Sequence, residues 1–185
     1  MGYLRPVRAS SPAPALENGC LDAFDRELSY LFQTLQRMGA GPREIEDLVQ
    51  EVFVVLYRNW PTFDTTRPIR PYLFGVAFRV MSAHRRRHAR ETPYALLEAE
   101  DGAPDPEASL RSKESTALLL AALERVPLPR RAVLIMHDLD GVPVAEVAER
   151  LSITRFGTYA RLRKARKELL SAVRRLTREG SLNDT

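Results

Sequence analysis

The stretch that decides the fold is "VPVAEVAERLSITRFGTYARLRKAR", residues 142–166. Its first part places apolar residues at the spacing of one helical face: Val144, Val147, Ala148 and Leu151. "SIT" follows as a tight turn, and a second, longer helix runs to about Leu176. Two helices joined in this way predict a helix-turn-helix, in which the second helix enters the major groove of DNA. A helical hairpin with a solvated basic face is the alternative interpretation.

The second helix of this motif separates into an inward and an outward face. Thr158, Leu162 and Ala165 are expected to face inward. Between Arg155 and Arg178 there are nine basic residues and one acid, which is typical of a surface that approaches phosphates. We expect base edges to be read by Arg155, Phe156, Tyr159, Ala160 and Arg163, and phosphates to be contacted by Arg161, Lys164, Arg166 and Lys167.

A second amphipathic helix, "EDLVQEVFVVLYRNW", occupies residues 46–60. Its apolar residues follow helical spacing, but its other face is a stripe of acidic and polar residues with one apolar member: Asp47, Gln50, Glu51 and Val54. Downstream, "RVMSAHRRRHAR" contains five arginines and no acid. The preceding loop carries Trp60 and Phe63, and aromatic rings beside arginines suit single-stranded nucleic acid. The aromatics could equally belong to the core.

No catalytic or metal site is expected from the sequence. His84 and His88 have the spacing of metal ligands on a helix, but no Glu, Asp or Cys accompanies them in this run. Cys20 and His137 have no evident partner for nucleophilic catalysis, and there is no Gly-rich phosphate loop. An enzyme acting on nucleic acid would need a metal or a general base. We therefore expect a non-enzymatic protein with no cofactor.

The chain as a whole is predicted to be all-α, with two small helical domains joined by a flexible linker. It has 185 residues, 44% of them hydrophobic, and a net charge of +4. It has no apolar leader and no run of 18 apolar residues, so a cytoplasmic protein is expected. The predicted segments are a flexible N-terminus (1–19), a first domain (20–90), an acidic linker (91–113), a second domain (114–178) and a tail (179–185).

Two motifs, in order, resemble the extracytoplasmic-function sigma factors, a family of bacterial transcription initiation factors. "EDLVQEVFVVLYRN" is similar to the family's region 2.2, and "RPYLFGVAFRVMSAHRRR" is similar to its regions 2.3 and 2.4. "ALERVPLPRRAVLIMHDLDGVPVAEVAERL" followed by "SITRFGTYARLRKAR" resembles region 4. The resemblance spans about residues 20–176.

The resemblance implies a division of labour between the domains. The surface of Asp47, Gln50, Glu51 and Val54 would dock on the beta-prime clamp helices of core RNA polymerase. The first domain would open the −10 element of promoter DNA, and the second would read the −35 element. The linker would thread toward the RNA exit path, and the beta flap and an anti-sigma factor are further expected partners. The residues implied at the −10 element are Trp60, Phe63, Arg79, Arg85, Arg86 and Arg87.

Several positions depart from the family pattern. Arg79 stands where Asn is frequent, Tyr159 stands where Lys is frequent, and Pro143 replaces a Ser cap. Ser152 replaces a turn Gly, and a non-Gly residue in the left-handed conformation costs about 1 kcal/mol. These changes affect promoter choice more than the fold. The alternative function is a stand-alone helix-turn-helix regulator that binds duplex DNA without acting as a sigma subunit.

Overall fold

The structure is a computed structural model that describes residues 14–91 and 110–183. Both stretches are built from helices, and neither contains a strand, so the all-α prediction is confirmed there. No helix in these stretches is both long and apolar enough to cross a membrane. In chain order the elements are α1 (Pro14–Arg37), α2 (Ile45–Asn59), the 3-10 turn η1 (Trp60–Thr62), α3 (Ile69–Glu91), α4 (Leu110–Glu124), α5 (Leu128–Leu134), the π-helical turn η2 (Ile135–Leu139), α6 (Val144–Arg150) and α7 (Arg155–Asn183).

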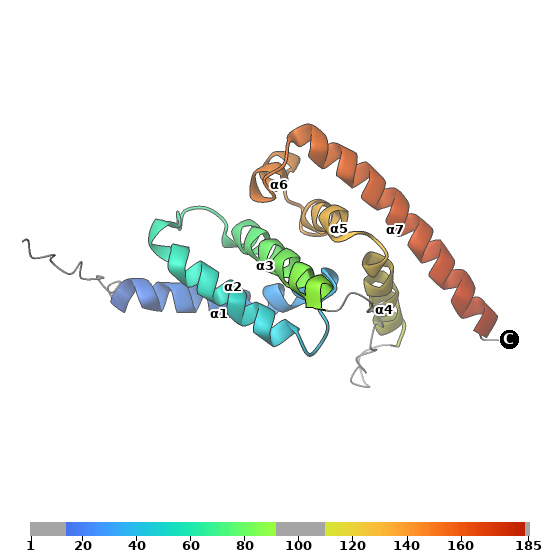
Figure 1. Ribbon diagram of the computed structural model, residues 1–185, viewed down its shortest axis with the longest axis horizontal. Helices are drawn as coiled ribbons and strands as arrows, with labels where there is room; N and C mark the ends of the chain where they lie inside the picture. The colour runs from blue at the N-terminus through green and yellow to red at the C-terminus, as the bar shows by residue number, and fades with distance from the viewer. Residues whose placement is uncertain (1–13, 92–109, 184–185) are drawn as a thin grey trace, which may run out of the picture.

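Helices α1, α2 and α3 pack on one another and form the N-terminal unit (Figure 1). The apolar stripe of α2 explains this packing, because its residues are all buried: Ile45, Leu48, Val49, Val52 and Leu56. Complete burial of one such side chain contributes roughly 1.5–3 kcal/mol. The polar stripe of the same helix is therefore left on the outside.

Helix α1 begins earlier than predicted and ends where predicted. It starts at Pro14, inside the segment expected to be flexible, and proline is well suited to the first turn of a helix. At the other end Gly39 adopts φ +85°, and its N–H bonds to the Gln36 carbonyl while the Ala40 N–H bonds to the Leu35 carbonyl. This is a Schellman ending, in which glycine takes the left-handed position.

Helices α4 to α7 form the C-terminal unit, and α7 runs along its outer side (Figure 1). The predicted turn between α6 and α7 is present. Ser152 has φ 54°, as expected for a residue that replaces a turn glycine, and the Ile153 N–H bonds to the Ala148 carbonyl at 2.9 Å. Pro143 precedes α6 without a side-chain cap. The helix-turn-helix prediction is confirmed.

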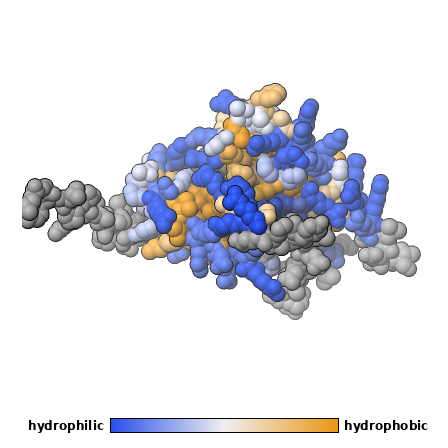
Figure 2. All heavy atoms as spheres, in the orientation of Figure 1, coloured by the Kyte–Doolittle hydropathy of each residue, from blue (hydrophilic) through white to orange (hydrophobic). Residues whose placement is uncertain are grey.

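The two units share one continuous hydrophobic core. α3 packs against α6, and α1 packs against α4. Hydrophobic side chains gather over the middle of the molecule in Figure 2, while hydrophilic ones cover the side of α7. This close association could not be predicted from the sequence, because a flexible linker is compatible with separate domains as well as with packed ones.

The outer boundaries differ from the expected ones in two places. α4 begins at Leu110, inside the predicted linker, and residues 92–109 of that linker lie outside the described residues. α7 continues to Asn183, past the predicted start of the tail at residue 179. An ion pair between Arg125 and Glu179, 3.4 Å apart, accompanies this extension.

Candidate functional site

The first part of α7 presents an open surface of basic and aromatic side chains. Phe156 is 85% exposed and Tyr159 is 61% exposed, although both are large apolar or aromatic residues. Arg155 and Arg163 are exposed beside them, and Ala160 is half-buried. The residues predicted to face inward are indeed buried: Thr158, Leu162 and Ala165.

Two threonines hold the beginning of this helix. The Thr154 hydroxyl accepts a hydrogen bond from the Gly157 N–H at 3.0 Å, which is the geometry of an N-terminal cap. The buried Thr158 hydroxyl donates to the Thr154 carbonyl at 3.0 Å, so its polar atom is satisfied. The Thr154 cap was not predicted, although threonine is one of the residues preferred at the N-cap of a helix.

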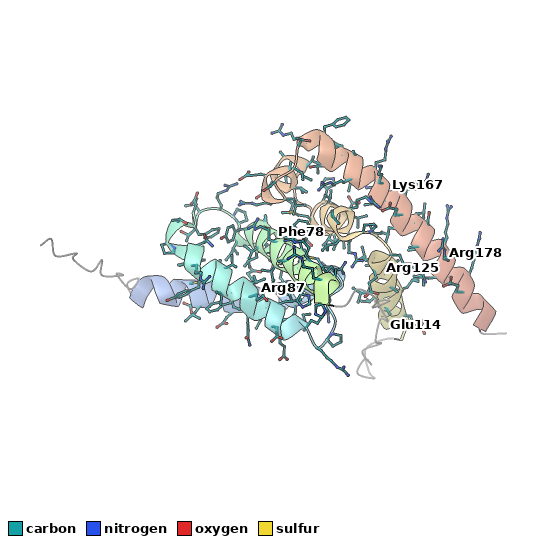
Figure 3. The ribbon with its side chains drawn as sticks, in the orientation of Figure 1. Phe78, Arg87, Glu114, Arg125, Lys167 and Arg178 are labelled. Carbon is teal, nitrogen blue, oxygen red and sulfur yellow. The ribbon has the colours of Figure 1, made fainter. Side chains whose placement is uncertain are left out.

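Basic side chains continue from α7 toward α4 and α5. Arg161 and Lys164 line a groove of about 350 Å³ with Pro127, Pro129 and Arg130. A second groove continues along α7, and Figure 3 shows Lys167 and Arg178 projecting from this helix. The charged residues of the second groove are Arg125, Arg130, Lys164, Lys167, Glu168 and Arg175.

Arg166 differs from the other predicted phosphate contacts, because it already has an anionic partner. Its guanidinium donates to both carboxylate oxygens of Asp138, at 2.7 and 2.8 Å. The hydrogen bonds from Arg166 hold the pKa of Asp138 below its usual range. Arg166 therefore braces α7 against η2 in this structure, and the prediction that it contacts phosphate needs this pair to break.

The acidic stripe of α2 lies on the surface, as its spacing predicted. Asp47 and Gln50 are exposed, and Val54 is 43% exposed. Glu51 is paired with Arg87 of α3 at 2.7 Å, and Arg87 lies beside α2 in Figure 3. We call the four residues Asp47, Gln50, Glu51 and Val54 the α2 acidic face.

The loop aromatics are packed more closely than a base-binding role requires. Trp60 is only 9% exposed and stacks on Phe63 with 5.4 Å between ring centroids. Phe63 is half-buried and also contacts the Tyr72 ring at 5.0 Å. The Trp60 ring is therefore packed in the core in this structure, and its contact with the −10 element stays a prediction that would require this ring to become exposed. Phe63 keeps part of its surface exposed.

The arginines at the end of α3 have unequal roles. Arg85 turns inward and donates to the Met38 carbonyl at 2.9 Å and to the Gly39 carbonyl at 3.4 Å. Its burial lowers the pKa of the guanidinium. Arg85 therefore fastens the end of α1 in this structure, and the prediction that it holds phosphate needs these hydrogen bonds to break. Arg86 is exposed.

A buried arginine links the two units. Arg131 of α5 is 2% exposed, and its guanidinium donates to the Met38 carbonyl of the N-terminal unit at 2.7 Å. It also donates to the Val126 carbonyl at 3.0 Å and to the Glu124 carbonyl. Burial, with the nearby Arg85 charge, lowers the pKa of Arg131 to about 10. The group still carries its charge at neutral pH, which explains why it needs three oxygen partners.

Polar contacts complete this interface. The Tyr30 hydroxyl donates to Asp140 at 2.7 Å, and Arg37 lies 3.5 Å from the same carboxylate. Burial raises the pKa of Asp140, and burial together with the Asp140 charge raises the pKa of Tyr30. Arg79 of α3 donates to the Arg150 carbonyl at 3.5 Å. Arg79 is exposed to solvent, and this hydrogen bond ties it to the C-terminal unit.

The two histidines of α3 have an acidic neighbour that the sequence did not suggest. The Glu44 carboxylate lies 3.8 Å from His84 Nε2 and 3.6 Å from His88 Nε2. No acid lies near these histidines in the sequence between residues 79 and 90. In the folded chain Glu44 lies beside both of them. Glu44 is forty residues away along the chain, just before α2.

Two family models match the chain, and they match in the predicted order. Residues 23–91 match Sigma-70 region 2, and residues 116–169 match Sigma-70, region 4. The first match covers most of the N-terminal unit, and the second covers the helix-turn-helix.

Similar proteins include several sigma factors. The chain is 26% identical to the RNA polymerase sigma factor NccH of Alcaligenes xylosoxydans xylosoxydans, over 75% of this chain and 78% of that one. It is 28% identical to the ECF RNA polymerase sigma factor SigF of Caulobacter vibrioides, over 76% and 77%. It is 31% identical to the ferric citrate uptake sigma factor FecI of Escherichia coli, over 60% and 65%.

Two solved structures share the fold. One is CnrH in complex with the cytosolic domain of CnrY, with a TM-score of 0.61, 19% identity and coverage of 84% of this chain and 87% of that one. The other is RpoE in complex with the anti-sigma factor NepR from Bartonella quintana, with a TM-score of 0.69, 16% identity and coverage of 88% and 98%.

These matches decide between the two functions left open by the sequence. A stand-alone helix-turn-helix regulator is not favoured, because region 2 is matched as well as region 4, and the relatives of similar length are sigma factors. The chain belongs to the extracytoplasmic-function sigma factors, which direct RNA polymerase to promoters.

Proposed function

We propose that the α2 acidic face binds the beta-prime clamp helices of core RNA polymerase. The single observation that supports this most strongly is the exposure of Val54 among Asp47, Gln50 and Glu51. An apolar side chain surrounded by polar groups is typical of the centre and rim of a protein interface. A partner helix with basic residues would compete with Arg87 for Glu51, because the Arg87–Glu51 pair is exposed and therefore weak.

The N-terminal unit, within residues 20–90, is proposed to open the −10 element. Arg79, Arg86 and Arg87 are the exposed cations of α3 suited to phosphates, and the exposed part of Phe63 offers a ring for stacking. The C-terminal unit, within residues 114–178, is proposed to read the −35 element through Arg155, Phe156, Tyr159, Ala160 and Arg163, with phosphates held by Arg161 and Lys164.

Engagement of the −10 element is proposed to accompany a separation of the two units. Arg79 donates one hydrogen bond to the Arg150 carbonyl at 3.5 Å, so α6 lies against part of the α3 surface that is proposed to meet this element. Gly75 lies so close to the same strip of α6 that a Cβ there would be 3.1 Å from the Arg150 carbonyl. We infer that the packed arrangement is the free form, and that polymerase binding draws α6 away from α3.

An anti-sigma factor is a proposed partner of the free form. CnrH and RpoE are described in complex with CnrY and with the anti-sigma factor NepR, and this chain shares their fold. Phe156, Tyr159 and Val54 are exposed apolar or aromatic residues that such a partner would cover. We place the chain in the cytoplasm, because its proposed partners, polymerase and promoter DNA, are found there, and we propose that it acts without catalytic chemistry of its own.

Binding to purified core polymerase tests the α2 acidic face. The combined variant Asp47→Ala, Gln50→Ala and Val54→Ser removes one charge, the amide and the apolar centre of this face. It should weaken binding at least tenfold, because a buried interface centre carries most of the binding energy. Asp25→Ala is the matched control, since Asp25 is an exposed acid on α1 and should bind as the wild type does.

The outcome that would contradict this proposal is equal binding by the combined variant and by Asp25→Ala, with both variants folded by circular dichroism. Promoter binding is measured separately by gel shift of the full-length chain, with and without core polymerase. A specific complex with duplex DNA in the absence of polymerase would restore the stand-alone regulator.

A further inference from the structure

The cluster of Glu44, His84 and His88 is made by two separate elements. His84 and His88 lie one turn apart on α3, so both rings point to the same side of the helix, with ring centroids 4.6 Å apart. Glu44 comes from the residue before α2 and directs one carboxylate oxygen, Oε1, at the Nε2 atoms of both rings, at 3.8 and 3.6 Å. The three donor atoms all lie within 4.8 Å of one another.

These separations suit a small divalent metal ion. Zn²⁺ binds imidazole nitrogen and carboxylate oxygen at about 2.0–2.2 Å in tetrahedral geometry, which places neighbouring donors roughly 3.3 Å apart. The distances from Oε1 to the two nitrogens exceed this value by only a few tenths of an ångström. The donor atoms of the two histidines lie within 4.8 Å of each other, so rotation of the imidazole rings would bring them onto one ion. Two histidines and one carboxylate, with water in the fourth position, form a familiar zinc ligand set.

The carboxylate is held in place by a second contact. The other oxygen of Glu44, Oε2, accepts a hydrogen bond from the Gly41 N–H at 3.2 Å. A partner of this kind outside the ligand set orients a metal ligand and strengthens the site. The side chains of His84, Glu44 and His88 are 17%, 36% and 58% exposed, so one side of the cluster is open for an ion and its water.

The surrounding charges permit a cation despite the arginines nearby. Arg85 donates to the Met38 and Gly39 carbonyls, and Arg87 is paired with Glu51 at 2.7 Å, so both are directed to other partners. The histidines also lie in the last turns of α3, and the carbonyl end of a helix favours positive charge.

We propose that Glu44, His84 and His88 form a binding site for a divalent transition metal, for which Zn²⁺ is the natural probe. The ion would join the loop before α2 to the end of α3. Because Glu44 precedes the α2 acidic face by three residues, the ion would also fix the start of the helix that carries this face. The site departs from the expectation of no metal, because Glu44 becomes a neighbour of the histidines only in the folded chain.

The test uses the full-length chain without a polyhistidine tag, stripped of metal by a chelator. Isothermal titration with Zn²⁺ should show one saturable site, and the Tm should rise with Zn²⁺ concentration because the ion binds the folded state. Loss of an outer-shell partner typically weakens metal binding about 10–100-fold. Removal of a direct ligand by Glu44→Gln, His84→Ala or His88→Ala should therefore weaken it by more than tenfold.

The third histidine of the chain supplies the matched control. His137 lies in η2, where its Nδ1 is 2.8 Å from the Val142 carbonyl, so His137→Ala should retain wild-type Zn²⁺ affinity. His88→Ala is the ligand variant least expected to disturb folding, because His88 is the most exposed of the three ligands. The proposal is overturned if the wild type shows no saturable Zn²⁺ binding and no rise in Tm. It is also overturned if Glu44→Gln binds as well as the wild type, or if His137→Ala loses binding to the same degree.

Discussion

Replacing Arg131 with methionine should destabilise the whole molecule. The guanidinium is buried and donates to three carbonyls: Met38 at the end of α1, and Glu124 and Val126 at the end of α4. Methionine fills much of the same space but donates no hydrogen bond. The Arg131→Met variant therefore removes a link between the two units and also the cap of α4.

The magnitude follows from the partners that remain. The Met38 carbonyl keeps Arg85 as a donor at 2.9 Å, whereas the Glu124 and Val126 carbonyls lose the hydrogen bonds that Arg131 donates to them. An unsatisfied buried polar group costs about 1–3 kcal/mol, which gives roughly 2–6 kcal/mol for two. Burial of the charged guanidinium is itself unfavourable, and it lowers the pKa of Arg131 to about 10. Methionine carries no charge, so the variant avoids this penalty, which offsets part of the cost. We expect a loss of roughly 2–4 kcal/mol in the free energy of unfolding.

Urea unfolding of the full-length chain measures this loss, with Arg130→Met as the control. Arg130 is the neighbouring residue, but it is half-buried and pairs with Glu168 at 2.8 Å, so its removal should cost less than about 1 kcal/mol. Arg131→Lys should fall between the two, because an ammonium group lacks the planar fork that reaches several oxygens at once.

The same variants report on the association of the two units. With spin labels on exposed positions of α2 and α7, Arg131→Met should broaden the distance distribution toward longer distances, and Arg130→Met should leave it unchanged. The reasoning is refuted if Arg131→Met and Arg130→Met agree in unfolding free energy to within about 0.5 kcal/mol and share one distance distribution.

Three further predictions concern single contacts. Gly39→Ala should lower the free energy of unfolding in urea by more than about 1–2 kcal/mol, because φ is +85° and the new Cβ would lie 2.5 Å from Arg131 Nη1. Gly41→Ala is the control, because a Cβ at Gly41 would make only an ordinary van der Waals contact. Thr154→Ala removes the N-cap of α7 and should lower stability by about 0.5–2 kcal/mol and weaken −35 binding in a gel shift of the polymerase complex. Asp138→Asn should lower stability by less than about 1 kcal/mol at neutral pH. Because Arg166 depresses the Asp138 pKa in the folded state, the stability difference from the wild type should begin to shrink as the pH falls below about 4 and should be lost once the pH passes the lower pKa of the folded state.

Local patterns predicted the secondary structure well, because a helix and its caps are set by residues close in the chain. The spacing in residues 45–56 identified the buried and exposed sides of α2. The inward Thr158 followed from helical register, and the left-handed Ser152 followed from the resemblance to a family that has a turn glycine at this position. The missed features at helix ends, such as the early start of α1 at Pro14, are positions where a few residues carry little periodic signal.

The roles of charged residues could be predicted only in part. Five arginines between residues 79 and 90 look alike in the sequence, yet Arg85 is directed to backbone carbonyls of α1 and Arg87 to Glu51. Trp60, which comes before this run, is buried. A run of identical residues does not indicate which side chains are exposed to solvent, because exposure depends on how the neighbouring helix packs.

The sequence by itself determined the helices, the helix-turn-helix, the exposed stripe on α2 and the family, because these depend on spacing along one helix or on motifs read in order. Only the tertiary structure decided that the two units pack together, that Arg131 is buried between them, and that Glu44 meets His84 and His88. Each of these contacts joins residues forty or more positions apart. Such pairs form because whole helices pack together around a shared core, and the residues close to either partner in the sequence do not indicate this packing.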